Sequence, residues 1–98
     1  MAEKFTTWDV AHHLVSDIDA AAYLDACIMG DPGDGSLVRA ALNDIARARG
    51  MSQLARDAGI SREGLYKALG DQANPSFATV LKVLHALGLQ MDVRPIAG

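Results

Sequence analysis

The side chains with the most suggestive chemistry lie within one short segment, residues 61–67. This segment combines a hydroxyl, two cations, a carboxylate and a phenol, carried by Ser61, Arg62, Lys67, Glu63 and Tyr66. On a helix that follows Ser61, the other four side chains stand at spacings i, i+1, i+4 and i+5 and therefore share one side. Arginine and lysine bind phosphate oxygens or guanine O6 and N7, glutamate can accept a hydrogen bond from cytosine N4, and tyrosine can contact phosphate or a thymine methyl group. The segment therefore predicts a helix face that binds nucleic acid.

Each of these residues also has an ordinary structural interpretation. Arg62 and Lys67 could be solvated charges, as most surface bases are. Tyr66 could pack its ring sideways on the domain, and Glu63 could pair with Lys67 four residues later on the same helix. Both interpretations stay open at this point.

Two short helices must position this face. The pattern predicts helices over 52–58 and 62–69, because a glycine follows each and Ser61 can serve as the N-cap of the second. Ala55 is small enough for the two backbones to approach, and Leu65 fills the space between the helices. Since Leu65 then faces inwards, the polar side of the second helix faces outwards. This is the arrangement of a helix–turn–helix whose second helix enters a major groove.

A longer helix over 36–49 is expected to precede this pair. Its inward side is predicted to be Val38, Ala41, Leu42 and Ile45, and its outward strip Arg39, Asn43 and Arg47. Arg47 and Arg49, near the end of the helix, could bind phosphate groups or interact with the negative end of the helix dipole.

The chain is acidic before a turn-rich segment at 30–35 and basic after it. Residues 1–34 carry seven acids and one base, a net charge of −6, whereas residues 35–98 carry eight bases and five acids, a net charge of +3. We predict an acidic helical extension with a hinge over 1–35 and a second unit over 36–98. The opposite charges fit either two different partner surfaces or packing of one part against the other.

Within the extension we expect a short helix over about 8–14 and a second helix that starts at Ser16. Ser16 and Asp19 resemble a capping box. The second helix has an apolar stripe at helical spacing, formed by Ala20, Tyr23, Leu24, Cys27 and Ile28.

The end of the chain predicts one more helix and then a change of period. Asn74 and Pro75 are expected to open the helix, with Pro75 at its first position, and an apolar face runs over 77–87. A short strand is expected next, with an apolar side formed by Leu89, Met91 and Val93. Because no other strand is expected, this one could be frayed, pair with another protein or pair with the same strand of a second copy. We predict pairing with a second copy, which forms a homodimer; a dimer through helical surfaces is the alternative.

The composition favours an all-α fold in a protein of 98 residues, with 17 Ala and 11 Leu against 11 Val and Ile together. No apolar run is long enough to span a membrane and no signal-peptide pattern is visible, so we expect a cytoplasmic protein. Cys27 is the only cysteine, and His12 and His13 are adjacent and so point about 100° apart on a helix. We therefore expect no enzymatic activity, no cofactor and no metal.

Residues 36–91 resemble the lambda-repressor-like (Xre/Cro) DNA-binding domain, through the helix pair described above, Asn74-Pro75-Ser76-Phe77 and Ala86-Leu87-Gly88-Leu89. The longer string over 46–69 is similar to the addiction-module antidote proteins, which are HigA-like antitoxins paired with a RelE/ParE-type toxin. The resemblance implies a transcriptional autorepressor that binds operator DNA and neutralises a HigB-like ribonuclease. It also implies contact between Gln53 and the DNA backbone.

For the toxin we predict contact with the acidic segment through Tyr23, Asp25 and Asp31. A ribonuclease must attract RNA and so is expected to have a basic face, which acidic residues beside an apolar stripe would attract and anchor. The stripe could instead pack against the chain's own core. The alternative function is a stand-alone Xre/Cro-type repressor without a toxin partner.

Overall fold

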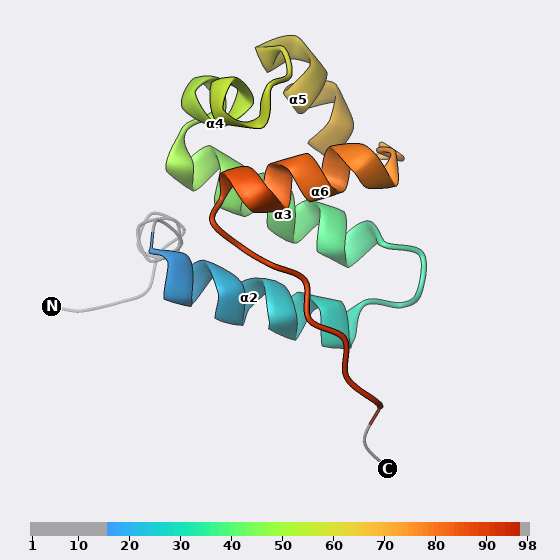
Figure 1. The fold of residues 1–98 in the computed structure, drawn as a ribbon. Helices are drawn as coiled ribbons and strands as arrows, with labels where there is room; N and C mark the ends of the chain where they lie inside the picture. The colour runs from blue at the N-terminus through green and yellow to red at the C-terminus, as the bar shows by residue number, and fades with distance from the viewer. Residues whose placement is uncertain (1–15, 97–98) are drawn as a thin grey trace, which may run out of the picture.

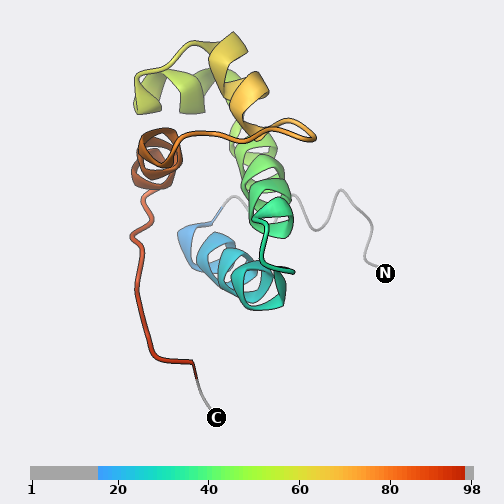
Figure 2. The same cartoon turned by 90° about the vertical axis from the view of Figure 1, so that its right-hand side faces the viewer.

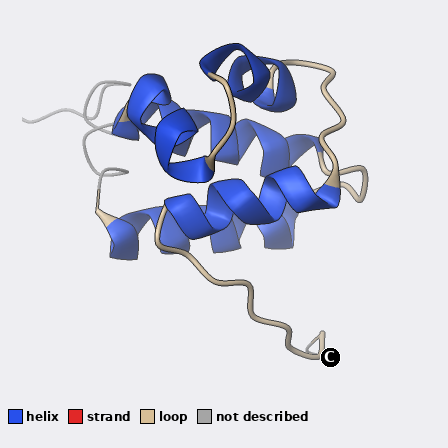
Figure 3. Cartoon of the chain, turned by 45° about the horizontal axis from the view of Figure 1, so that its top comes forward, coloured by secondary structure: helices blue, strands red, loops and turns tan. Residues whose placement is uncertain are grey.

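The computed structural model describes residues 16–96, and all regular structure in this part of the chain is helical (Figure 1). The five helices are α2 (Asp17–Gly30), α3 (Ser36–Arg49), α4 (Met51–Ala58), α5 (Arg62–Leu69) and α6 (Phe77–Ala86). Figure 3 shows helices and loops but no strand among these residues. The predicted all-α fold is thus confirmed over 16–96, and the bounds predicted for α3 and α5 are correct. The helix predicted over 8–14, with His12 and His13, lies outside the described residues.

Helix α3 lies at the centre of the fold. It packs against α2 on one side and against α4 and α5 on the other, while α6 packs against α4. Figures 1 and 2 show the same order from two directions, with α2 below α3 and the α4–α5 pair above it. The largest fully buried side chains are Leu42, Ile45, Leu65, Leu69, Val83 and Leu87. No helix in 16–96 combines the length and apolar character needed to cross a membrane.

Helix α2 shares this core. It begins after Ser16, whose hydroxyl oxygen accepts a hydrogen bond from the Asp19 backbone N–H at 3.1 Å, as predicted. The side chains that lie in the core or against it are Ala20, Tyr23, Leu24 and Cys27. Ile28, expected in the same stripe, is instead half exposed. Of the two arrangements that the opposite charges allow, the structure shows α2 packed against the basic part of the chain.

The start of α3 is capped by a residue from outside the helix. Gly35 occupies the N-cap position with a left-handed φ of 81° and has no side chain to offer. The carboxylate of Asp31 takes over this function: it accepts hydrogen bonds from the backbone N–H groups of Gly33, Gly35, Leu37 and Val38 at 2.8–3.1 Å. These donors, Gly35 first, hold the pKa of Asp31 below its usual value. Asp31 therefore has a structural role, which is to stabilise the start of α3.

Helix α6 begins two residues later than predicted. Ser76 is its N-cap, and the Ser76 hydroxyl oxygen accepts a hydrogen bond from the backbone N–H of Thr79 at 3.1 Å. Because this hydroxyl satisfies the first turn, Pro75 stays outside the helix, and its predicted place at the first helical position is wrong. Phe77, expected on the buried face, is exposed.

The strand predicted after α6 is also wrong. Gly88 has a positive φ of 79° and turns the chain so that residues 89–96 run past α2 as an extended segment (Figures 1 and 2). A strand requires a paired neighbour, and the described chain provides none here. Leu89 packs against the core whereas Met91 and Val93 are exposed, so the three side chains do not form one apolar side.

Replacement of Asp31 by asparagine tests the cap on α3. Asp31→Asn removes the charge that four N–H groups stabilise, so it should lower the melting temperature at pH 7. Because folding depresses the pKa of Asp31, the stabilising contribution is present above the unfolded-state pKa and is lost as pH falls through the folded-state value. The difference in melting temperature from wild type should therefore be steady near neutrality and shrink below about pH 4. Asp57→Asn, on the exposed side of α4, is the matched control and should change little. Equal melting temperatures for Asp31→Asn and wild type at pH 7 would contradict the assignment.

Candidate functional site

Helices α4 and α5 are joined by a tight turn that fixes one against the other. Gly59 adopts left-handed dihedral angles, φ 74° and ψ 29°, which a residue without a side chain adopts at least cost. The backbone N–H of Ile60 donates to the carbonyl of Ala55 at 3.0 Å. Ala55 and Leu65 are both buried, so the two helices meet through these side chains as their spacing predicted.

The polar residues of α5 lie on its outer side. Ser61 is the N-cap, and its hydroxyl oxygen accepts from the backbone N–H of Gly64 at 2.8 Å. The exposed side chains of the helix are Arg62, Glu63, Tyr66 and Lys67, the four that the sequence placed on one side. We refer to these four as the α5 face.

Two members of the α5 face hold each other in place. The guanidinium carbon of Arg62 lies 5.3 Å from the centre of the Tyr66 ring. Arg62 Nη2 also donates to the hydroxyl oxygen of Tyr66 at 3.3 Å. A cation over an aromatic ring is attracted by the ring electrons, so the Arg62 side chain is ordered along the helix surface.

Helix α4, which precedes α5 in the chain, carries a second cluster of exposed polar side chains. The Gln53 side-chain amide donates to Asp57 Oδ1 at 2.8 Å, and its oxygen accepts from Arg56 Nη2 at 2.7 Å. All three side chains are on the exposed side of the helix. Sequence reasoning singled out Gln53 and missed Arg56, although the three-residue spacing between them was a usable signal.

The two arginines at the end of α3 have different environments. Arg47 is exposed. Arg49 is largely buried: Nη2 lies 2.7 Å from Asp17 Oδ1, and Nη1 donates to the carbonyl of Leu87 at 3.4 Å. Arg49 Nε is buried without a hydrogen-bond partner among the described residues. Arg49 thus links α3 to α2 and to the end of α6, and it does not join the α5 face.

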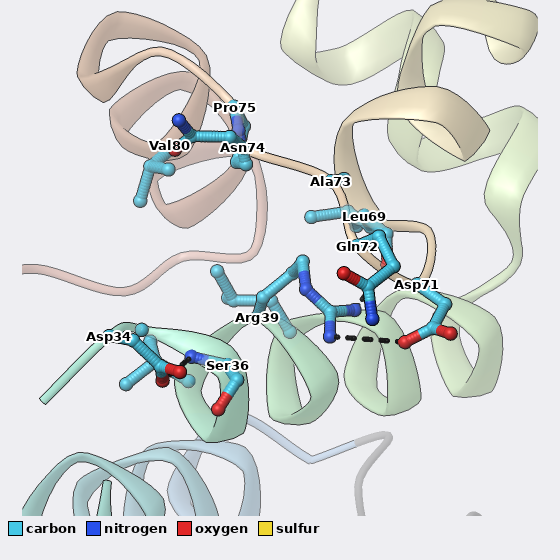
Figure 4. A pocket seen from close by; sticks show the side chains of 13 residues that line it. Asp34, Ser36, Arg39, Leu69, Asp71, Gln72, Ala73, Asn74, Pro75 and Val80 are labelled. Atoms are coloured by element: carbon cyan, nitrogen blue, oxygen red, sulfur yellow. Dashed lines mark hydrogen bonds and ion pairs between the residues drawn. The ribbon is translucent and has the colours of Figure 1, made fainter. Parts of the chain in front are cut away.

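A third arginine of α3 fixes the far end of α5. Figure 4 shows Arg39 in a hollow of about 540 Å³ between the start of α3 and the segment that connects α5 to α6. Arg39 Nη1 donates to the carbonyl of Leu69 at 3.3 Å, and Nη2 lies 3.7 Å from Asp71 Oδ1. The outward position predicted for Arg39 is wrong, because its side chain is only 15% exposed and lines this hollow beside Leu69 and Asp71. Since Leu69 is the last residue of α5, the contact positions the helix that carries the polar face.

The three residues predicted to contact a toxin all have partners within the chain. The hydroxyl of Tyr23 donates to Asp44 Oδ2 at 2.8 Å, and this hydrogen bond is the main cause that raises the pKa of Tyr23 to about 12. Asp25 Oδ1 lies 2.8 Å from Arg94 Nη2, and Asp31 caps α3. Three large apolar side chains of α2 are exposed, Ile18, Ile28 and Met29.

The fold and these surfaces define the class as a small all-helical protein with a polar, partly basic helix face. In residues 16–96 no group of three or more histidine, cysteine, aspartate or glutamate residues could hold a metal ion.

A family model described as "Probable addiction module antidote protein" matches residues 4–95, and the chain belongs to this family. It is 54% identical over 94 residues to an uncharacterized protein of Haemophilus influenzae (strain ATCC 51907 / DSM 11121 / KW20 / Rd), an alignment that covers 96% of this chain and 95% of the relative. No solved structure matches. The resemblance to antidote proteins is confirmed, and membership implies a toxin partner.

Substitution of Arg49 tests whether this residue stabilises the fold. Arg49→Met keeps much of the aliphatic stem but removes the ion pair with Asp17 and the hydrogen bond to Leu87. We expect the free energy of unfolding, measured with urea, to fall by about 1–3 kcal/mol. Arg47→Met makes the same chemical change at an exposed position of α3 and should alter it by less than about 0.5 kcal/mol. Equal stability of the two variants would show that the Arg49 contacts contribute nothing.

Proposed function

We propose that this antidote binds operator DNA as an autorepressor and neutralises a toxin of the RelE/ParE (HigB-like) ribonuclease type in the cytoplasm. The observation that carries DNA binding is the α5 face, exposed on a helix that is fixed against α4. In this proposal α4, the turn and α5 form a helix–turn–helix of the lambda-repressor-like (Xre/Cro) kind. The N-terminal half of α5 enters the major groove.

Arg62 is the residue best prepared to read a base. Its stacking on Tyr66 and the hydrogen bond between them restrict the guanidinium before DNA is bound, which lowers the entropy lost on binding. A guanidinium can bind guanine O6 and N7 together through two hydrogen bonds. Glu63, beside it at the start of the helix, can accept from cytosine N4. Lys67 lies at the last turn of α5 and is assigned to a phosphate.

Phosphate contacts from the preceding helices would orient α5 in the groove. Gln53 and Arg56 are exposed on α4, and Arg47 is exposed near the end of α3. Amides and guanidinium groups of this kind contact the DNA backbone without reading sequence. Arg49 is left out of this set because its guanidinium is used inside the fold.

Operator binding of this kind requires two copies. One helix reads only a few base pairs, and specific operators usually place two half-sites about 34–36 Å apart. We therefore propose a homodimer. The dimer contact predicted for Leu89, Met91 and Val93 depended on a β-strand, and residues 89–93 do not form one. Leu89 packs against the core of its own chain.

Replacement of Arg62 and Lys67, one at a time, tests the α5 face. The probe is a duplex that carries the promoter region of this chain's own coding sequence, and binding is measured at several salt concentrations. Arg62→Ala should weaken binding by about 5- to 150-fold and relax the preference for the operator over unrelated DNA. Lys67→Ala should weaken binding to all sequences alike. It should also reduce the slope of log affinity against log salt concentration by about one, since one phosphate contact is lost.

Lys82→Ala is the control for these variants, because Lys82 is an exposed base on α6. It should bind the operator duplex as wild type does. If Arg62→Ala and Lys67→Ala also bind with wild-type affinity, the α5 face does not contact the operator.

Toxin neutralisation is tested with the small protein encoded next to this chain. Expression of that protein alone should arrest growth, and co-expression with this chain should restore it, because the two form a complex that masks the toxin. The complex should be recovered by affinity purification of either component. Growth arrest that this chain does not relieve, together with intact operator binding, would support the stand-alone repressor instead.

A further inference from the structure

A groove lies on the side of the molecule away from α5. One wall is α2, and the other is the extended segment 88–94 that follows α6 (Figures 1 and 2). The groove has a volume of about 560 Å³. Between the walls, α3 and α6 contribute the apolar side chains Val38, Leu42, Val80 and Leu84. The turn at Gly88 makes this shape possible, because it directs the chain along α2 instead of away from it.

The α2 wall is the side of the helix next to its core stripe, and it is exposed except where Arg94 contacts Asp25. Its residues stand at i, i+3, i+7 and i+10 and are Ile18, Ala21, Asp25 and Ile28. Ile18 is 82% exposed and Ile28 is 51% exposed, whereas Ala20 and Leu24 of the same helix are buried in the core. A surface helix of a globular protein usually exposes polar residues outside its core stripe, so the exposed Ile18 and Ile28 indicate a protein contact.

The charges on the walls indicate the chemistry of the partner. Helix α2 carries three aspartates and no base. Across the groove, Arg94 lies 2.8 Å from Asp25 and its Nε lies 3.6 Å from Asp92. The groove lining thus carries three carboxylates, Asp17, Asp25 and Asp92, and one base, Arg94, while the Asp17 carboxylate also pairs with Arg49 of α3. Because the lining carries more carboxylates than bases, a basic partner would complement it.

We propose that this groove is the toxin-binding site and that it takes an amphipathic segment of the toxin. The apolar side chains of that segment enter between α2 and residues 88–94, and its lysine or arginine side chains lie against the aspartates of the rim. Apolar anchors hold such a complex, while complementary charge speeds association and selects the partner. The inference rests on the proposed antitoxin function. It retains Asp25 from the residues predicted for toxin contact and replaces Tyr23 and Asp31 by Ile18 and Ile28.

A double substitution in the full chain tests the groove, with the purified small protein encoded next to this chain as the probe. Ile18→Lys/Ile28→Lys places two cations in an acidic groove where a basic partner would bind. We expect affinity for the probe, measured by calorimetry, to fall at least ~30-fold, which corresponds to the loss of one central contact. The matched control is Met29→Lys/Val93→Lys, which adds the same charge at two exposed positions that do not line the groove. The control should bind within about 3-fold of wild type, and both variants should melt and bind operator DNA as wild type does.

Several outcomes would overturn the proposal. If wild type binds the probe and the groove variant binds equally well, the toxin contacts another surface while the proposed function stands. If the groove variant keeps toxin binding but becomes monomeric in sedimentation experiments, a second copy occupies the groove. If it keeps toxin binding but melts well below the control, the groove is filled by this chain's own residues. If wild type does not bind the probe, the proposed antitoxin function fails first, and the groove assignment fails with it.

Discussion

The burial of α3 among the other helices is the constraint on which the rest of this structure depends. Its apolar side chains pack against α2 on one side and against α4 and α5 on the other. An arginine at each end of α3 makes polar contacts with residues that are far away in the sequence. Arg39 in the first turn holds the last carbonyl of α5, and Arg49 in the last turn holds α2 and the end of α6. Because Asp31 caps the start of the same helix, one element determines the positions of both candidate binding surfaces.

These surfaces lie on opposite sides of α3. Helix α5, which carries the α5 face, is at one end of the molecule, and α2, which forms one wall of the groove, is at the other, as both views of the ribbon show. On the proposed assignments, a toxin in the groove would leave the operator-binding helix open. Any influence of one ligand on the other would then pass through α3 or through a change in the pairing of two copies. The opposite charges of the two parts of the chain fit this division, although α2 belongs to the common core.

Most features set by neighbouring residues could be predicted from the sequence, although the Ser76 cap of α6 was missed, whereas features set by distant partners could not. The turn at Gly59 and the cap at Ser61 involve residues within five positions of each other, so residue type and spacing indicate them. The partners of Arg49 are 32 and 38 residues away, and no local pattern reports such contacts. Acidic character alone does not distinguish a helix cap such as Asp31 from a surface charge that is available for binding. The alternation over 89–94 fits an extended segment as well as a strand, and only a partner strand separates the two.

The central claim is that operator and toxin use different surfaces of this antidote, and a two-ligand NMR titration tests it most directly. Backbone amide signals of the isotope-labelled chain are followed first with the operator duplex and then with the purified toxin. Separate surfaces predict that DNA shifts the signals of residues 61–67 and that toxin shifts those of Ile18, Ala21, Ile28 and the 88–94 segment. Shifts of one common set of residues by both ligands, or no change in residues 61–67 on addition of DNA, would contradict it.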